Sequence, residues 1–495
     1  MSFSFETMSL SPAIRKLAST SAIYGIGGIL SRFAYMLLLP FFTSTLTPND
    51  YGALSLISLV TTACQGLLNL GTSNSISILF FSTSEHRNRS QVIWTAALLL
   101  IVNCILLLAL FWWASSYLSL KVLGSADYER LIQLALVSLA CSVIVDPFLA
   151  YMRMNNMAVL YVSMTLLSFG VTIGVSSWLV LVREVGVIGV VIAQCCGQSF
   201  LLIISLFFVG RKLLLTFDLQ LIRPLVSIGF PSVVGSFATL LLTYSDRWLL
   251  ERFLGLDQLG IYSVGVSFGM IVALLTGAFD TAWSPFFTSY INKREEAGQL
   301  FPRIFTYYVF GFGTLIVLIF AIAKPLVSLL VDLSFEGAWI VVGLIALSQV
   351  MYGAFSILST GLYFSRSLGQ ISYVKWIVVT INFGLNIVLI PLMGIFGAAA
   401  AMFIGYLILT IMTYMRSQRE FRISYDWRRV SNFLFPFFVV VVLIWTSCFV
   451  FTSWMSTYLN LLVAFLFVLF VWFKVLTQYE YKYIVNYLKN LLRKV

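Results

Sequence analysis

The sequence predicts an all-α polytopic membrane protein with about fourteen transmembrane helices, and two observations carry this prediction. The first is composition: of 495 residues, 60% are hydrophobic and 10% are charged, whereas about 25% of the residues in a soluble domain are charged. The second is arrangement. The apolar residues fall into long runs joined by short connections, and a run of about 20 residues crosses a bilayer as a helix.

The apolar runs can be followed in order along the chain. The first six spans are expected at about 18–43, 52–81, 91–117, 130–152, 158–182 and 186–209. The next six are expected at 223–250, 260–288, 303–330, 337–364, 373–391 and 396–415. A last pair is expected at 432–452 and 455–476. Residues 1–17 form a cytoplasmic lead-in, and residues 481–495 form a cytoplasmic tail.

Lysine and arginine residues predict the orientation of these helices. Outside the expected spans, 22 of them lie on the side of the two termini and 6 on the opposite side. Since basic residues concentrate in cytoplasmic loops, both termini are expected to face the cytoplasm. The same rule accounts for the net charge of +11, so no nucleic-acid partner is expected. Asp246 and Arg247, near the outer end of the seventh span, are expected to pair at the membrane interface.

An internal repeat divides the chain. Leu46, Gly52 and Ser55 recur as Leu254, Gly260 and Ser263, and Gly186, Gly189, Ala193 and Gly197 recur as Gly394, Gly397, Ala401 and Gly405, all at an offset of 208. Each unit holds six spans, so the two copies share one orientation and are related by a pseudo-two-fold axis along the membrane normal. We expect a six-helix N-lobe at 18–215, a six-helix C-lobe at 216–420 and an added helix pair at 421–480.

A single arginine lies deep within the first span. Arg32 would sit near the bilayer midplane, at a cost of about 2.5–3.5 kcal/mol on insertion scales, and Tyr35 follows one turn later. A guanidinium matches phosphate geometry, so Arg32 is predicted either to bind the anionic part of a ligand or to pair with Asp146 or Asp280, the acidic residues of spans four and eight. Lys375, near the cytoplasmic end of span eleven, either joins Arg32 or reaches the interface.

Polar side chains recur at helical spacing in three spans. Gln65 and Asn69 belong to such a stripe in span two, Tyr352 in span ten, and Asn382 with Asn386 in span eleven. Each stripe lies on one helical face. Because lipid offers no hydrogen bonds, these faces meet other helices or water. Interhelical hydrogen bonds would explain any one residue, whereas several stripes in separate helices favour a hydrated central cavity.

No residue pattern predicts catalysis. The only histidine, His86, lies in a loop, and the six cysteines lie in apolar runs without CxxC spacing. That pattern indicates neither a disulfide framework nor a zinc site, and no P-loop is present. We therefore expect no catalytic residue, no metal ion and no cofactor, and we expect that the chain is not an enzyme.

Three stretches carry a resemblance to a known family: TPNDYGALSL after span one, YSDRWLLERFLGLDQLGIYSVGVSF across spans seven and eight, and AFDTAWSPFFTSY in span eight. The chain resembles bacterial polysaccharide flippases of the O-antigen and capsule exporter kind, in the multidrug/oligosaccharidyl-lipid/polysaccharide exporter superfamily. The resemblance implies two helical bundles around a V-shaped central cavity. It also implies transport of undecaprenyl-diphosphate-linked oligosaccharide repeat units from the inner to the outer leaflet of the bacterial cytoplasmic (inner) membrane, by alternating access, for lipopolysaccharide biosynthesis.

The resemblance also suggests roles for the residues named above. Arg32, with Lys375, would hold the diphosphate, the polar stripes would solvate the sugars, and Asp146 or Asp280 would carry a coupling H⁺ or Na⁺. Membrane lipids and a polysaccharide polymerase are further candidate partners. A peptidoglycan-precursor flippase and a small-molecule or drug exporter of the same superfamily remain the nearest alternatives. A membrane enzyme and a non-transporting scaffold are disfavoured.

Overall fold

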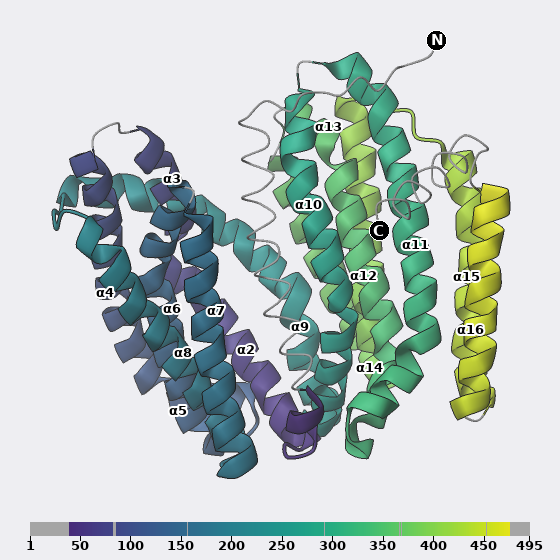
Figure 1. Cartoon of the computed structure of the whole chain (residues 1–495), viewed down its shortest axis with the longest axis horizontal. Helices are drawn as coiled ribbons and strands as arrows, with labels where there is room; N and C mark the ends of the chain where they lie inside the picture. The colour runs from purple at the N-terminus through teal and green to yellow at the C-terminus, as the bar shows by residue number, and fades with distance from the viewer. Residues whose placement is uncertain are drawn as a thin grey trace, which may run out of the picture. The chain divides into compact units, whose positions relative to one another are not determined.

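A computed structural model describes residues 39–82, 86–155, 157–291, 293–365, 367, 369–451 and 453–475, and every regular element within these ranges is helical (Figure 1). Eleven helical segments of this part of the chain are long and apolar enough to cross a membrane. The predicted fold class, an all-helical membrane protein with many spans, is confirmed. The first predicted span, at 18–43, lies almost entirely outside the described residues.

The elements of the first half follow the predicted order. They are α2 (Pro48–Asn69), α3 (Thr72–Ser82), α4 (His86–Trp113), α5 (Ser115–Val122), η1 (Ala126–Tyr128), α6 (Glu129–Met154), α7 (Ala158–Ser177), η2 (Trp178–Val182), α8 (Val187–Phe208), η3 (Gly210–Lys212) and η4 (Leu219–Leu221). The start of α2 explains part of the stretch TPNDYGALSL, one of those that carry the family resemblance. Asp50 N–H donates to the Thr47 hydroxyl (3.3 Å), Thr47 N–H donates to the Asp50 carboxylate (2.8 Å), and Pro48 opens the helix. TPND is therefore a capping box with proline at the first helical position.

The second half continues in the same way. Its elements are α9 (Ile222–Gly269), α10 (Ile271–Ser289), α11 (Arg294–Leu330), η5 (Leu333–Ala338), α12 (Trp339–Leu358), α13 (Thr360–Phe364), α14 (Gly369–Glu420), α15 (Trp427–Val450), α16 (Ser453–Phe470) and η6 (Val471–Val475).

Two of these helices are interrupted at a glycine. Gly255 breaks α9 with φ 82°, and Gly394 breaks α14 with φ 60°, a region that favours glycine. Beyond Gly394 the chain folds back on the preceding helical segment, as the hydrogen bond from the Asn382 amide to the Ala401 carbonyl at 2.8 Å shows. These breaks fall between predicted spans seven and eight and between spans eleven and twelve. With both helices divided there, the described segments correspond in order to predicted spans two to fourteen.

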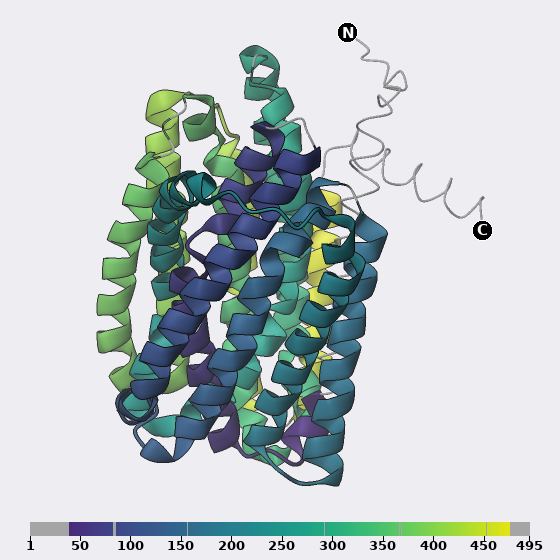
Figure 2. The same ribbon diagram turned by 90° about the vertical axis from the view of Figure 1, so that its left-hand side faces the viewer.

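The chain forms two compact units, Met1–Gly260 and Ile261–Val495. In the first, α6 contacts α2, α4 and α8, and α7 contacts α8. Figure 2 shows these helices running side by side. In the second, α12 contacts α10, α11 and α14, so α12 and α14 repeat the pairing of α6 and α8. The compact units divide within α9. The lobe boundary at 215/216, which the repeat predicts, stays a prediction.

The backbone supports the repeat. Gly186 before α8 has φ 70° and ψ −147°, and Gly394, its counterpart at the offset of 208, has φ 60° and ψ −140°. Both glycines introduce the sixth helix of their copy.

The added helix pair, α15 and α16, packs on α11. Phe433 of α15 is fully buried, with ring centroids 5.0 Å from Phe310 of α11 and 5.6 Å from Phe467 of α16. Gly313 of α11 leaves the space that the Phe433 ring occupies. The pair is therefore held by aromatic packing around a glycine.

Candidate functional site: a polar cavity beside α9

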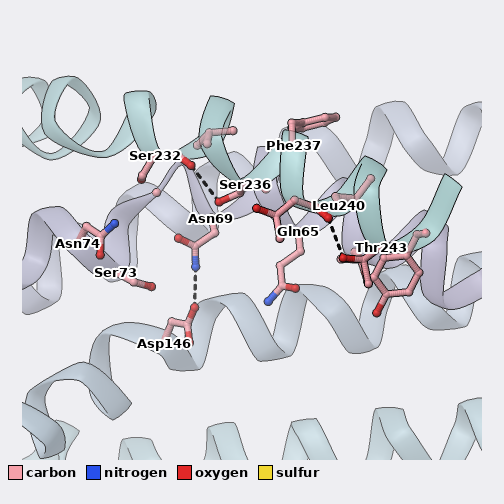
Figure 3. A pocket seen from close by; sticks show the side chains of 16 residues that line it. Gln65, Asn69, Ser73, Asn74, Asp146, Ser232, Ser236, Phe237, Leu240 and Thr243 are labelled. Atoms are coloured by element: carbon pink, nitrogen blue, oxygen red, sulfur yellow. Dashed lines mark hydrogen bonds between the residues drawn. The ribbon is translucent and has the colours of Figure 1, made fainter. Parts of the chain in front are cut away.

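A cavity of about 460 Å³ lies within the first compact unit, between α2, α3, α6 and the first part of α9 (Figure 3). Its polar lining comprises Thr62, Gln65, Asn69, Ser73, Asn74, Asp146, Ser232, Ser236, Thr239, Thr243 and Tyr244. The apolar part of the wall is formed by Phe237, Val233 and Leu240. Ligand sites combine apolar walls with a few polar groups that orient the ligand, and the larger share of polar side chains here suits a polar organic ligand.

Asp146 is held by a defined hydrogen bond. The Asn69 side-chain amide donates to Asp146 Oδ2 at 2.5 Å, and the Thr72 hydroxyl donates to Asn69 Oδ1 at 3.2 Å and to the Asn69 carbonyl at 2.9 Å. Because both ends of the Asn69 amide are engaged, its orientation is fixed. Gln65 and Asn69 project from α2 toward the helix that carries Asp146 (Figure 3).

The first part of α9 presents a hydroxyl face to the cavity. Ser232, Ser236, Thr239 and Thr243 follow one another at spacings of four, three and four. The Ser236 hydroxyl donates to the Ser232 carbonyl at 2.9 Å, and the Thr243 hydroxyl donates to the Thr239 carbonyl at 2.8 Å. With these protons used within the helix, the oxygens remain as acceptors for a ligand. This face was not among the predicted stripes, although the same search for helical spacing would have found it.

Arg247 lies behind the cavity wall. Its guanidinium carbon is 4.2 Å from the centroid of the Tyr244 ring, and Nη1 donates to the Thr243 carbonyl at 2.8 Å. The Asp246 carboxylate is 3.9 Å from Nη1, and the two side chains are only 6% and 12% exposed, Asp246 being the more buried. The predicted pair is thus formed, but its arginine is chiefly engaged with Tyr244 and Thr243, which both line the cavity. A cation stacked on a ring face holds that ring in place.

The structure brings together some of the predicted site residues. Gln65, Asn69 and Asp146 line the one cavity. Tyr352 and Lys375 belong to the second compact unit, where the Tyr352 ring packs 5.7 Å from Phe355 and Lys375 Nζ lies 5.9 Å from the same phenylalanine ring.

Asn382 is 2% exposed. Besides donating to the Ala401 carbonyl, it accepts at Oδ1 from the Asn386 amide at 3.0 Å. An interhelical hydrogen bond, the alternative considered for the polar stripes, thus accounts for Asn382, whereas the Asn386 amide donates within its own helix.

The second candidate coupling carboxylate also accepts a hydrogen bond from a neighbouring helix. The Ser356 hydroxyl of α12 donates to Asp280 of α10. In each compact unit, therefore, one intramembrane carboxylate joins two helices: α6 and α2 through Asp146, and α10 and α12 through Asp280.

Arg32 and Tyr35 lie outside the described residues. Their counterparts at the offset of 208 are Leu240 and Thr243, and both line the cavity.

Comparison with known proteins decides the family. The profile of the family described as "Polysaccharide biosynthesis protein" matches residues 17–291, more than half of the chain. The chain belongs to this family. It is 24% identical over 339 residues to the succinoglycan biosynthesis transport protein ExoT of Rhizobium meliloti (strain 1021), a match that covers 68% of this chain and 66% of that protein, just under two thirds of its length.

The fold is shared with solved transporters. The lipid II flippase MurJ in an inward closed conformation superposes with a TM-score of 0.70 at 13% identity, covering 92% of this chain and 98% of that one. An inward-facing multidrug resistance MATE family transporter of the MOP superfamily gives 0.62 at 14% identity, covering 82% and 98%. The predicted family and superfamily fold are confirmed.

Proposed function

We propose that this polysaccharide biosynthesis protein is a flippase. It moves undecaprenyl-diphosphate-linked oligosaccharide repeat units, of the kind used for O-antigen and lipopolysaccharide, from the inner to the outer leaflet of the bacterial cytoplasmic membrane by alternating access. Family membership supports a polysaccharide substrate, and the name of the Rhizobium relative supports transport. Both termini face the cytoplasm in this proposal, as the distribution of basic residues predicts.

The observation that carries the proposal is the chemistry of the cavity lining. Sugar hydroxyls donate and accept hydrogen bonds, and the wall offers amides from Gln65 and Asn74 together with the hydroxyl face of α9. Phe237 and Tyr244 add aromatic surfaces. A volume of about 460 Å³ is in the range of small-ligand sites and suits part of an oligosaccharide.

The charged residues have separate roles in this proposal. Arg32 binds the diphosphate with Lys375, and Tyr35 contacts the adjoining sugar. The positions of Leu240 and Thr243 on the cavity wall support this assignment through the repeat. Asp146, which lines the cavity, and Asp280 carry the coupling H⁺ or Na⁺. A polysaccharide polymerase receives the flipped repeat unit.

The test is deletion of the gene in its host, followed by mass spectrometry of lipid-linked sugars and by lectin access to each membrane leaflet. The proposal expects repeat units to accumulate on the cytoplasmic face and wild-type protein to clear them. Arg32→Ala fails to clear them and Arg32→Lys does so in part, because lysine keeps the charge without the planar fork. Equal clearance by all three proteins would mean that Arg32 does not hold the diphosphate.

The accumulated species separates the rival functions. A peptidoglycan precursor in place of the polysaccharide repeat unit would favour a precursor flippase. If no lipid-linked sugar accumulates, the glycan substrate is wrong and a small-molecule exporter becomes the better reading.

A further inference from the structure

Two backbone crossings join α2–α3 to α9 at the cavity, and the inner one borders it directly, since Gly71 and the neighbouring Ser73 and Asn74 belong to the lining. Toward the predicted outer side, a Cβ on Gly52 would overlap the Leu256 carbonyl, and a Cβ on Gly260 would overlap the Pro48 carbonyl. Toward the predicted cytoplasmic side, Gly71 and Gly229 meet in the same way. The lining residues of α2 and α9, Thr62–Asn69 and Ser232–Tyr244, lie between the two crossings along both helices.

The outer crossing follows the repeat. Pro48 and Leu256 are counterparts at the offset of 208, and so are Gly52 and Gly260. The contact of Gly52 with Leu256 therefore matches the contact of Gly260 with Pro48. Such a reciprocal pair of contacts is expected on a pseudo-two-fold axis. Nearby, the Tyr128 hydroxyl donates to Asn49 Oδ1 at 2.9 Å, at the first turn of α2. The crossing joins the first turns of two helical segments, since Gly255 interrupts α9 just before it.

The inner crossing joins a break between two helices to a proline-containing turn of α9. Leu70, with φ 52°, and Gly71, with φ 69°, separate α2 from α3. A bulky residue in the left-handed region is uncommon and indicates strain. On the other side, Pro231 follows Gly229 by two residues and lacks a backbone donor. Both segments can therefore bend at this contact at a point where the regular pattern of helical hydrogen bonds is already incomplete.

We propose that the Gly71–Gly229 contact is the inner gate of the cavity, and that the Gly52–Gly260 crossing closes its outer end. The inner gate opens by bending at Leu70–Gly71 and at Pro231. The gate also adjoins Asn69, which lies one residue before the break at Leu70–Gly71 and donates a hydrogen bond to Asp146. The meaning of the gate for transport rests on the proposed alternating access, but its test does not require the substrate.

Substituted glycines separate the two ends. In Gly229→Ala, the new Cβ would lie 2.5 Å from the Leu70 carbonyl oxygen and 2.9 Å from the Gly71 carbonyl, closer than carbon atoms approach these groups. The inner contact then cannot close, although alanine is the better helix former. Gly260→Ala disturbs the outer crossing instead. Gly235→Ala is the matched control, because Gly235 lies on the same helix as Gly229 and has nothing within 4 Å of its Cβ position.

The reporter is a single cysteine in the cavity. The full chain, with its six cysteines replaced by serine and with Gln65→Cys added, is labelled by a membrane-impermeant maleimide in inside-out and right-side-out vesicles. We expect Gly229→Ala to raise the labelling rate from the cytoplasmic side about tenfold, the shift produced by destabilising the closed contact by about 1.4 kcal/mol. Gly260→Ala raises labelling from the outer side, and Gly235→Ala matches its parent. Equal cytoplasmic labelling in Gly229→Ala and Gly235→Ala would overturn the proposal.

A second variant keeps the proposal testable if Gly229→Ala fails to fold. Pro231→Ala restores the backbone donor that proline lacks and makes this part of α9 stiffer. If the gate opens by bending at Pro231, this variant lowers the labelling rate of Gln65→Cys from the cytoplasmic side. Equal cytoplasmic labelling in Pro231→Ala and its parent would refute the gate.

The two proposals fail in different ways. Unchanged labelling with normal glycan clearance removes the gate and leaves the flippase. Shifted labelling in a strain whose deletion accumulates no lipid-linked sugar removes the flippase and leaves the gate.

Discussion

Replacing Asn69 with alanine removes the donor that Asp146 accepts at 2.5 Å. A hydrogen bond to a charged group contributes about 1.5–3 kcal/mol, so Asn69→Ala should destabilise the protein by that amount. Because the melting temperature of a chain of 495 residues shifts by about 1 °C per kcal/mol, it should fall by roughly 1.5–3 °C. The double variant Asn69→Ala/Asp146→Ala should lose less than the sum of the single changes, because no unpartnered carboxylate remains in the membrane.

The assay is thermal unfolding of the purified protein in detergent, with the two single variants and the double variant compared as a cycle. Asn382→Ala is a useful comparison, since that amide bonds the Ala401 carbonyl and the Asn386 amide and no charged group. Each of these neutral hydrogen bonds should contribute the smaller amount of about 0.5–1.5 kcal/mol. If the Asn69 and Asp146 effects add, the two side chains do not interact and the arrangement of this cavity wall has been misjudged.

Two further predictions concern packing around the site and the added helices. Arg247→Lys should lower the rate of glycan clearance several-fold at unchanged protein level, because an ammonium group gives a weaker stack on Tyr244, a contact of about 0.5–2 kcal/mol in the native protein; clearance equal to wild type would show that Tyr244 needs no support. Gly313→Ala should destabilise the protein by about 1–3 kcal/mol by pressing a methyl group into the Phe433 ring. Its control, Gly311→Ala on the same helix, has open space at the Cβ and should be neutral in the same melting experiment.

The sequence was sufficient for the order of the helices and for the repeat. Apolar length determines where a span can lie, and the described helices follow the predicted order. The repeat was found from small residues at one offset, and the structure gives those residues a physical purpose. Gly186 and Gly394 adopt the same left-handed backbone, while Gly52 and Gly260 permit close crossings. Because these positions favour glycine, their importance could be predicted from the sequence.

The roles of individual polar residues could not be read in the same way. Asn69 and Asn382 are both asparagines on polar helical faces, yet the first holds a cavity carboxylate and the second bonds the Ala401 carbonyl. Every residue has a carbonyl, so the sequence does not mark that partner. Gly405 was the sequence feature that indicated a close approach of another helix to Asn382, because a Cβ at Gly405 would come within 2.7 Å of the Asn382 amide nitrogen. The polar face of an interior helix is therefore predictable, but its partner depends on packing.

The cavity wall itself favours a carbohydrate over a drug-like cation. Among the lining residues that the structure describes, Asp146 is the one ionisable carboxylate, and Asn69 already occupies one of its oxygens. A site for lipophilic cations would profit from free carboxylates and a wider aromatic surface. Here the hydroxyl oxygens of α9 accept hydrogen bonds, while Gln65 and Asn74 can donate them. Neutral groups of both kinds hold a sugar through many weak bonds, each of about 0.5–1.5 kcal/mol. A transporter needs such bonds, because a ligand bound on one side of the membrane has to be released on the other.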